Sequence, residues 1–413
     1  MESLHRRSDS LLSTVTTAYE RPLLRLIDWS DPLILLLGPR GVGKTTLLVQ
    51  RLKALDLPPS KALYIDMGDL YFRENRLINF IEIFIAQGGT TLLIDEIHRY
   101  GHNTWAAEIK QAYDLYRSKL NLVVTGSSVV KIVNEQADLS RRALKYRMAG
   151  LSFREYLLLK NEISLPTVSI EEITKKQKEI SRDILSSANF TPVAALHEYW
   201  LEGYYPYFLE RRSGYVSRLL DSVQTVLEHD IPYGTDANAS DPHKLGKLLY
   251  AIASSAPFTP NINKISQRTN ISRPTLANYL RQLENAHLIT SLRQEGKGIS
   301  TLGKPDKIYL DNPNLAAALA PGKVDVGTQR ETFFLSQIKQ LTFGHPLFPP
   351  EITLPKKGDF VFQDRDDRYL FEIGGPNKSR KQISGEQSAF TVVDTDRSGE
   401  DDRIPLWLFG LLY

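Results

Sequence analysis

The residues best suited to do chemistry lie in a glycine-rich segment near the N-terminus. Residues 38–45, Gly-Pro-Arg-Gly-Val-Gly-Lys-Thr, fit the spacing G-x-x-x-x-G-K-[ST] of a phosphate-binding loop. Its glycines let consecutive backbone N–H groups surround a phosphate, and the N-terminus of the next helix adds partial positive charge. The pattern predicts that Lys44 contacts the β- and γ-phosphates of a nucleoside triphosphate and that the Thr45 hydroxyl binds Mg²⁺. The predicted nucleotide-binding residues here are Gly38, Pro39, Arg40, Gly41, Val42, Gly43, Lys44, Thr45 and Thr46.

A pair of acids completes the predicted site. Residues 91–96, Thr-Leu-Leu-Ile-Asp-Glu, have the pattern of a buried strand that delivers two carboxylates at its C-terminal end, the edge where parallel sheets bind ligands. Asp95 is expected to hold Mg²⁺, and Glu96 to polarise the attacking water, which favours hydrolysis over transfer to another substrate. His98 follows directly and is interpreted as an ordinary polar residue at the strand exit, with contact to the site as the alternative.

Two later segments carry further candidates. Residues 120–128 form an apolar run that ends in Thr-Gly-Ser-Ser, and a strand there is expected beside the loop strand, with Thr125 or Ser127 near the γ-phosphate. The alternative is an ordinary loop. Arg141 and Arg142 are candidates for a residue that one subunit supplies to its neighbour's γ-phosphate, where it stabilises charge during hydrolysis. The alternative for this pair is two solvated arginines.

The elements that position these residues follow from the spacing of short apolar runs. An amphipathic helix is expected over residues 13–28, ahead of Pro32. Strand-length runs then alternate with helical stretches, which predicts a parallel sheet covered on both faces. The expected strands are Leu33–Leu37, Ala62–Met67, Thr91–Asp95, Leu120–Thr125 and, as a fifth, Tyr146–Ala149.

The order and spacing of the motifs add a resemblance. The loop at 38–46, Asp-Glu-Ile-His at 95–98, Thr-Gly-Ser-Ser at 125–128 and Leu-Ser-Arg-Arg at 139–142, followed by Leu-Ser-Phe-Arg-Glu-Tyr at 151–156, resemble prokaryotic AAA-superfamily ATPases that carry a C-terminal domain of unknown function. The Gly-Tyr-Tyr-Pro sequence at 203–206 also looks like an element of the helical lid of that group.

The resemblance implies an α/β fold with ATP and Mg²⁺ as cofactors. A P-loop NTPase parallel sheet with a helical lid would be followed by a winged-helix domain and a small α/β domain like those of nucleases. We expect an ATPase core over residues 1–155, a helical lid over 156–240, a winged helix over 241–320 and a restriction-endonuclease-like domain over 321–413.

Residues 262–310 favour a winged helix independently of the resemblance. A short helix is expected over Ile262–Asn270, and a second helix is expected to follow Ser272, its N-cap, with Pro274 in the first turn. The core-facing positions of the second helix are Leu276, Tyr279, Leu280 and Leu283, and the more exposed positions are Arg273, Thr275, Asn278 and Arg281. Leu288–Arg293 and Lys307–Leu310 are expected to form the wing. Such a helix suits the DNA major groove, and contact with a protein is the alternative.

The last segment contains three acids that could share a metal ion. A hairpin that turns near residue 366 is expected to set Asp359 opposite Glu372, and Glu331 could join them. This resembles the restriction-endonuclease-like fold, in which such acids bind Mg²⁺ and a lysine two residues after the second acid assists the attacking water. Position 374 is glycine, so Lys378 or Lys381 would have to substitute, and an inactive domain is the alternative.

Composition bounds the function. The 413 residues include no cysteine, which excludes disulfides and thiolate chemistry, and carry a net charge of +3, too small to indicate nucleic-acid binding by itself. No apolar run approaches the roughly 20 residues of a membrane span, so we expect a cytoplasmic protein. The expected function is an ATP-hydrolysing switch or motor that contacts double-stranded DNA and forms homo-oligomers. The alternatives are an ATP-gated nuclease and a slow signalling ATPase that binds a protein partner.

Overall fold

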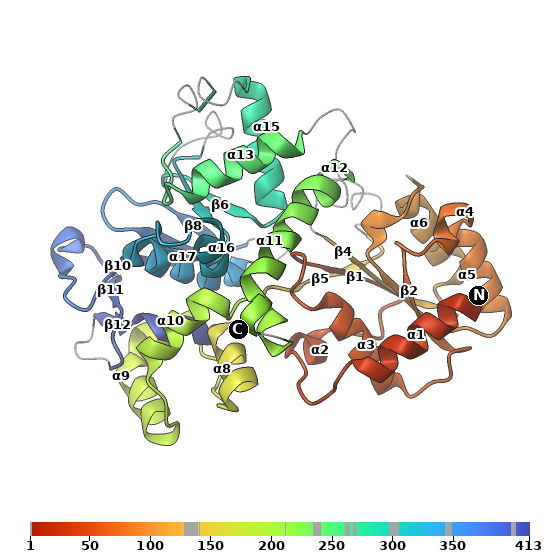
Figure 1. Ribbon diagram of the computed structural model, residues 1–413. Helices are drawn as coiled ribbons and strands as arrows, with labels where there is room; N and C mark the ends of the chain where they lie inside the picture. The colour runs from red at the N-terminus through yellow and green to blue at the C-terminus, as the bar shows by residue number, and fades with distance from the viewer. Residues whose placement is uncertain are drawn as a thin grey trace. The chain divides into compact units, whose positions relative to one another are not determined.

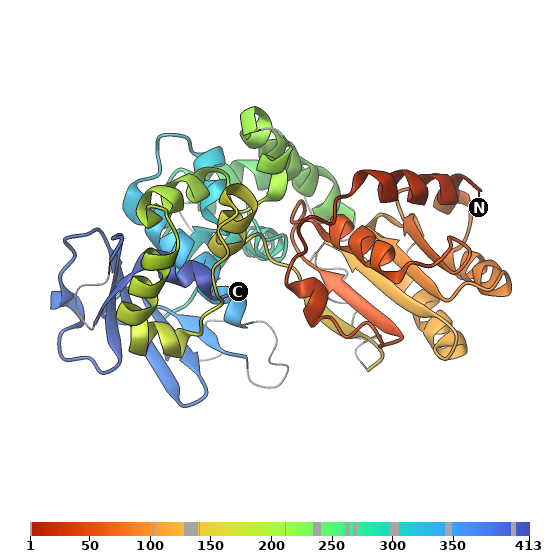
Figure 2. The same ribbon diagram turned by 90° about the horizontal axis from the view of Figure 1, so that it is seen from below.

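The protein is described here by a computed structural model (Figures 1 and 2). It describes residues 2–102, 104–127, 139, 141–210, 212–233, 241–260, 265–266, 271–296, 305–342, 349–397 and 402–413. The chain divides into two compact units. The first contains residues 1–149 and 225–240, and the second contains residues 150–224 and 241–413.

A parallel five-stranded sheet forms the centre of the first unit. Its strands lie in the order β2-β3-β4-β1-β5, and every neighbouring pair is parallel. The strands are β1 (Leu33–Leu37), β2 (Ala62–Asp66), β3 (Thr91–Asp95), β4 (Asn121–Gly126) and β5 (Leu144–Arg147). The first four strands are almost wholly buried, as expected of apolar runs covered on both faces. The predicted strands are therefore confirmed, with shifts of one or two residues at the ends.

Helices cover this sheet on both sides (Figure 1). The chain passes from β1 through α3 to β2 at the edge of the sheet. It then returns through α5 to β3 and through α6 to β4. Because the crossovers are right-handed and run in opposite directions, α3 lies on one face of the sheet and α5 and α6 on the other. The helical segments are α1 (Glu2–Thr14), α2 (Leu23–Leu26), α3 (Lys44–Leu55), α4 (Tyr71–Glu74), α5 (Leu77–Ala86), η1 (Ile97–Arg99), α6 (Trp105–Tyr116), η4 (Val226–Asp230) and α12 (Ile231–Tyr233).

The N-terminal helix differs from the expectation. It spans Glu2–Thr14 rather than residues 13–28, because the β-branched run after residue 14 and Pro22 disfavour helix. Gln50 of α3 donates hydrogen bonds to the carbonyl oxygens of Thr16 and Tyr19, at 3.0 and 2.7 Å. The side chain of Gln50 therefore holds the segment between α1 and α2. These bonds replace those that a helix would have made.

The second unit combines helices with a mixed sheet. Its five-stranded sheet has the order β12-β11-β10-β9-β8, in which β10, β11 and β12 are parallel and β8, β9 and β10 are antiparallel. The strands are β8 (Glu351–Thr353), β9 (Phe360–Asp364), β10 (Asp367–Gly374), β11 (Ala389–Val393) and β12 (Arg403–Pro405), and a separate antiparallel hairpin pairs β6 (Ile289–Leu292) with β7 (Lys307–Leu310).

The helical segments of the second unit lie both before and among these strands. They are α8 (Phe153–Asn161), α9 (Ile170–Ser187), α10 (Pro192–Glu202), η2 (Pro206–Leu209), η3 (Arg212–Gly214), α11 (Tyr215–Thr225), α13 (Pro242–Ala253), α15 (Arg273–Asn285), α16 (Pro313–Leu319), α17 (Val326–Ile338), η6 (Lys339–Thr342), η7 (Arg380–Ile383) and η8 (Leu406–Leu411). No helix among the described residues is long and apolar enough to span a membrane.

The segments expected on either side of residue 320 share one core. Tyr309 of β7 and Phe334 of α17 both contact Phe360 of β9, and Tyr309 donates a 2.6 Å hydrogen bond to Glu331 of α17. A helix buried along most of its length, as α17 is, needs partners on several sides. The lid, the winged helix and the last segment remain predictions as separate domains, and in the structure they belong mainly to one compact unit, with residues 225–240 in the other.

Candidate active site

The predicted phosphate-binding loop connects β1 with the N-terminus of α3. Gly41 and Gly43 adopt φ values of 82° and 100°, in the left-handed region that favours glycine. A side chain at Gly38 would lie 2.2 Å from the carbonyl oxygen of Met148, so the loop can follow this path only with glycine there. Helix α3 begins at Lys44 without a side-chain cap, and its first N–H groups are therefore suited to bind an anion.

Lys44 is buried at the centre of this loop. Its ammonium group donates hydrogen bonds to the carbonyl oxygens of Gly38 and Pro39, at 2.9 and 2.8 Å. Burial lowers the pKa of Lys44, although the carboxylates of Glu96 and Asp95 oppose this shift. The cation thus lies inside the loop that would surround a phosphate.

Asp95, at the end of β3, is bound by three hydroxyl groups. Its Oδ2 accepts a 2.6 Å hydrogen bond from Thr45 and a 2.8 Å hydrogen bond from Tyr64 of β2, and its Oδ1 accepts one from Thr125 of β4. Burial, and next the nearby charge of Asp95, raise the pKa of Tyr64, which keeps this phenol a donor. Tyr64 was not anticipated, because within an apolar strand it looked like a core residue.

Glu96 follows with a left-handed backbone. Its φ is 53°, and its N–H donates to Asp95 Oδ1 and to Thr125 Oγ1, at 3.0 and 3.2 Å. Left-handed residues other than glycine are uncommon and cluster at functional sites. The Glu96 Oε2 lies 3.5 Å from Arg40 Nη1 and 3.4 Å from His98 Nε2, yet it accepts no hydrogen bond from the residues that the structure describes.

Asp230 joins this group from η4, far away in sequence. Its side chain is 3% exposed, and its two oxygens accept hydrogen bonds of 3.2 and 3.4 Å from Arg40 Nη1. Although burial opposes it, contact with His98 and the charges of Arg40 and Lys44 lower the pKa of Asp230. Sequence reasoning missed this residue. The available signal was an acid at helical spacing from the buried Val226 and Leu227, a position that usually faces a core.

His98 is part of the site rather than an ordinary polar residue at the strand exit. Its side chain is 5% exposed, and its Nε2 lies 3.4 Å from Glu96 Oε2 and 3.5 Å from Asp230 Oδ1. The N–H of Ser127 donates to His98 Nδ1 at 3.3 Å. Nδ1 is therefore an acceptor, and Nε2 faces the two carboxylates.

The remaining candidates from the sequence lie apart or have other contacts. Arg142 forms an ion pair with Asp114 of α6, at 2.8 Å, and Arg141 is exposed. Their action on a neighbouring subunit remains a prediction. Thr125 contacts Asp95 and Ser127 contacts His98, so both lie at the carboxyl edge of the sheet beside the acidic pair.

This arrangement fits ATP with Mg²⁺. The uncapped N-terminus of α3 and the buried Lys44 suit phosphates, and the oxygens of Thr45 and Asp95, 2.6 Å apart, are the hard donors that Mg²⁺ prefers. The unbonded Oε2 of Glu96 leaves an acceptor for a water molecule. No residue among those described contradicts this ligand set.

The three acids of the second unit also approach one another. The N–H of Ile373 donates a 2.7 Å hydrogen bond to Asp359, which places this acid beside β10 as the predicted hairpin register requires. Burial, and then the charges of Glu331 and Glu372, raise the pKa of Asp359 to about 7. The carboxylates are therefore close enough to disfavour each other's ionised form.

Each of the other two acids has a cation of its own. Glu331 lies 3.0 Å from Lys307 Nζ, and Glu372 pairs with Lys378, the residue expected to substitute for a lysine at position 374. Within the described residues, no group of three or more His, Cys, Asp or Glu side chains is placed to hold a metal ion. A shared metal site at Glu331, Asp359 and Glu372 remains a prediction.

Helix α15 and the hairpin β6–β7 have the form expected of a recognition helix and wing. Ser272 caps α15 by accepting a 3.3 Å hydrogen bond from the N–H of Thr275, and Pro274 lies in its first turn. The predicted core positions Leu276, Tyr279, Leu280 and Leu283 are buried. Most of the short helix predicted over residues 262–270, and the tip of the wing, lie outside the described residues.

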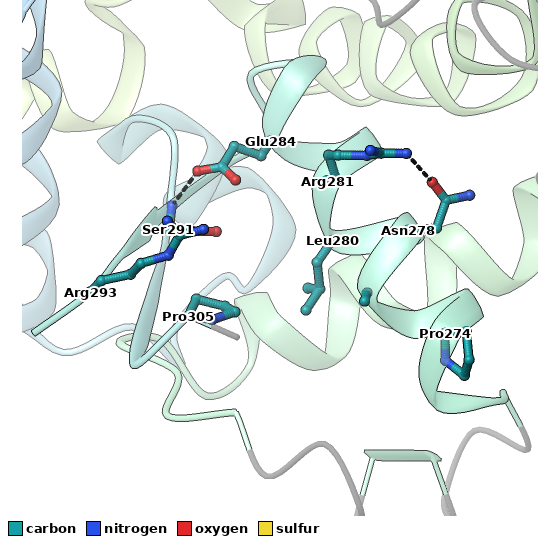
Figure 3. A pocket seen from close by; sticks show the side chains of 9 residues that line it. Pro274, Asn278, Leu280, Arg281, Glu284, Ser291, Arg293 and Pro305 are labelled. Carbon is teal, nitrogen blue, oxygen red and sulfur yellow. Dashed lines mark hydrogen bonds between the residues drawn. The ribbon is translucent and has the colours of Figure 1, made fainter. Parts of the chain in front are cut away.

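A pocket of about 390 Å³ opens between α15 and the hairpin (Figure 3). Its lining residues are Pro274, Ala277, Asn278, Leu280, Arg281, Glu284, Ser291, Arg293 and Pro305. Arg281 donates to Asn278 at 3.0 Å, and the N–H of Ser291 donates to Glu284 at 3.0 Å. Burial raises the pKa of Glu284, although the hydrogen bond from the N–H of Ser291 opposes this shift.

Two parts of the chain match known families. Residues 30–157, which hold the loop, Asp95 and Glu96, match the family described as AAA domain. They form an AAA-type ATPase-like domain. Residues 193–325 match a family described as a domain of unknown function, DUF8612.

Individual relatives give less information. The uncharacterized protein MJ1637 of Methanocaldococcus jannaschii is 28% identical over 287 residues, which are 67% of this chain and 60% of that protein. This chain therefore spans about three-fifths of the length of that curated relative.

Solved structures show distant likenesses. The RuvB Holliday junction branch migration motor of Thermotoga maritima aligns at 15% identity with a TM-score of 0.26, over 72% of this chain and 90% of that chain. AMPPCP-bound DnaA from Aquifex aeolicus aligns at 14% identity with a TM-score of 0.26, over 68% of this chain and 86% of that chain. TM-scores this low do not establish a shared arrangement of the whole chain.

Proposed function

We propose that this protein is an Mg²⁺-dependent ATPase whose hydrolysis is coupled to double-stranded DNA. The observation that carries the ATPase part is the hydrogen bond between Thr45 and Asp95, at 2.6 Å, because it joins the phosphate-binding loop to the acidic pair. The match of residues 30–157 to an AAA domain supports the same function.

Each residue has a distinct task in this proposal. The N–H groups at the start of α3 and the ammonium group of Lys44 bind phosphate oxygens in exchange for the loop carbonyls that now hold Lys44. Thr45 and Asp95 hold Mg²⁺, which when bound neutralises charge that develops on the phosphates. Glu96 accepts a hydrogen bond from the attacking water through its unbonded Oε2 and orients it.

The DNA-coupling part rests on α15 and the adjacent pocket. Arg273 and Arg281 are exposed on this helix, and Arg281, Asn278 and Arg293 line one pocket of about 390 Å³ (Figure 3). Arginine and asparagine are side chains suited to phosphates and base edges. A helix backed by a hairpin can present them in the major groove.

The deciding experiment measures steady-state ATP hydrolysis with and without duplex DNA, with Lys44→Ala as the blank. Hydrolysis above the blank that rises with DNA, and rises less at high salt because phosphate contacts are screened, would support both parts of the proposal. A slow rate that DNA does not change would reject the DNA part and favour a signalling ATPase with a protein partner. A rate equal to the blank would reject the ATPase.

A second candidate function is an ATP-gated, metal-dependent DNA nuclease. The observation that favours it is that the charges of Glu331 and Glu372 act on Asp359, together with the ion pair of Lys378 and Glu372. It requires Glu331 and Glu372 to release their lysines to a metal ion. DNA cleavage that needs Mg²⁺ and is lost in Asp359→Ala would support this function, and uncut DNA at all ATP concentrations would reject it.

A further inference from the structure

The segment that follows α11 belongs to the first unit, although the residues before and after it in sequence belong to the second. Residues 225–240 belong with residues 1–149, although residues 150–224 and 241–413 form the second unit. We call residues 225–233, the described part of this segment, the strap. It comprises Thr225, which is the last residue of α11, followed directly by η4 and α12. The strap is therefore covalently continuous with the second unit while it contributes to the first.

The strap brings one charged side chain into the active site. Asp230 ends η4, is 3% exposed and takes two hydrogen bonds from Arg40, whose backbone belongs to the phosphate-binding loop. A buried carboxylate is tolerated when it is paired and hydrogen-bonded, as this one is. Arg40 is thus tied to a residue 190 positions away.

Arg40 has two carboxylates within reach but gives its hydrogen bonds to only one. Its Nη1 lies 3.2 Å from Asp230 and 3.5 Å from Glu96, and Glu96 Oε2 accepts no hydrogen bond from the described residues. A guanidinium hydrogen bonded to Oε2 would occupy the electron pair that the attacking water needs and would make Glu96 a weaker base. In the structure the hydrogen bonds of Arg40 go to Asp230, and the buried Oε2 of Glu96 accepts none from the described residues.

We propose that Asp230 is a positioning residue that takes the hydrogen bonds of Arg40, which lies between Asp230 and Glu96, and that ATP hydrolysis depends on the strap being docked against the phosphate-binding loop. This inference rests on the proposed ATPase function. With the strap docked, Glu96 can accept a hydrogen bond from water. When the strap is withdrawn, Arg40 loses its partner and binds Glu96, and hydrolysis stops.

Nucleotide binding is expected to persist in both states. Lys44 is held by loop carbonyls and Thr45 by Asp95, and neither forms a hydrogen bond with Asp230. Loss of the strap is therefore expected to lower the rate of ATP hydrolysis without weakening nucleotide binding. This difference distinguishes a positioning role from a general structural one, which would weaken both.

The test compares Asp230→Asn with wild type in the full-length protein. The kcat for ATP is expected to fall by at least about tenfold, since the loss of a general base costs roughly 10²–10⁴-fold. The Kd for a fluorescent ATP analogue, measured by titration, is expected to stay within about threefold. Glu228→Gln is the matched control, because it removes an exposed acid from the same turn and should leave kcat unchanged.

A second substitution tests the competition itself. In the Asp230→Asn background, Arg40→Gln removes the group that would capture Glu96, so kcat is expected to recover toward that of Arg40→Gln alone. No recovery, or a wild-type kcat in Asp230→Asn, would overturn the proposal. If Asp230→Asn does not fold, Asp230→Glu decides, because it keeps the carboxylate but displaces it from Arg40. A lower kcat with an unchanged Kd for the ATP analogue supports the proposal, and a wild-type kcat, or a joint loss of kcat and binding, overturns it.

The same measurements separate this inference from the function on which it rests. Wild-type hydrolysis no faster than Lys44→Ala would mean that the ATPase proposal has failed. Hydrolysis in wild type that Asp230→Asn leaves unchanged would mean that only the role of the strap has failed.

Discussion

The hydroxyl group of Thr45 lies 2.6 Å from Oδ2 of Asp95, so a direct hydrogen bond joins the two halves of the active site. Thr45 is the second residue of α3, the helix after the phosphate-binding loop. Asp95 ends β3, which lies two positions from β1 in the sheet. Because both belong to regular elements, their separation is fixed by the packing of α3 on the sheet. A magnesium ion would meet donors that need little rearrangement.

The first prediction concerns Glu96. Glu96→Gln keeps the size of the side chain but cannot accept a proton from water, so turnover is expected to fall by about 10²–10⁴-fold while ATP binding is retained. Single-turnover hydrolysis and nucleotide titration measure the two quantities. An unchanged hydrolysis rate would remove Glu96 from the reaction.

The second prediction concerns Tyr64. Tyr64→Phe removes the 2.8 Å hydrogen bond to Asp95 Oδ2 and keeps the ring. Groups that orient a metal ligand typically change metal affinity by about 10–100-fold, so the Mg²⁺ concentration for half-maximal hydrolysis is expected to rise about tenfold. The rate at saturating Mg²⁺ should stay near that of wild type.

A tyrosine in the same unit provides the control for this experiment. Tyr71 packs its ring against Phe72 and Phe80. Tyr71→Phe should leave the Mg²⁺ dependence unchanged. An equal shift in both variants would show that the effect comes from packing rather than from Asp95.

The sequence was sufficient to predict the phosphate-binding loop, the acidic pair and the strands of the first sheet. These features are local: a glycine pattern and apolar runs of strand length determine them. Tyr64 and Asp230 were out of reach because their partners are 31 and 190 positions away. Such contacts depend on strand order and on the return of the chain, which no local pattern encodes.

The sequence patterns also did not predict how the chain divides into two compact units. The hairpin β6–β7 has the signature of a wing, yet Lys307 and Tyr309 of β7 bind Glu331 of α17, across the expected boundary at residue 320. The local sequence pattern identifies the hairpin, but the side chains of β7 determine which helix the hairpin packs against.

The third prediction concerns DNA contact by α15. Arg281→Ala removes one exposed guanidinium group, so DNA affinity is expected to fall and the slope of log affinity against log salt to decrease by about one. Fluorescence anisotropy at several salt concentrations measures both. Arg182→Ala, on α9 of the same unit, is the control, because Arg182 is equally an exposed arginine on a helix. Equal losses in both variants would contradict a specific role for α15.

The fourth prediction concerns the buried pair of Lys339 and Asp311. Lys339 binds Asp311 where η6 meets the strand β7, and its Nζ also lies 3.2 Å from the hydroxyl of Thr290. Burial alone would raise the pKa of Asp311, but the charge of Lys339 and contact with His287 hold it well below its usual range. A carboxyl group with a lowered folded-state pKa stabilises the protein above its unfolded-state pKa, near 3.8, and loses that contribution as the pH falls further.

Lys339→Ala should therefore destabilise the protein in a pH-dependent way. At pH 7 the variant leaves a buried carboxylate without its cation, and the free energy of unfolding is expected to fall by about 3–5 kcal/mol. Below about pH 4 the carboxyl group of Asp311 becomes neutral in the variant, so the difference from wild type should shrink. Urea unfolding at pH 7 and pH 4 measures this, with Lys244→Ala, which breaks the exposed pair with Asp241, as a control expected to change stability by less than about 1 kcal/mol. A loss of equal size at both pH values would mean that packing of the lysine stem, rather than the charge pair, accounts for the effect.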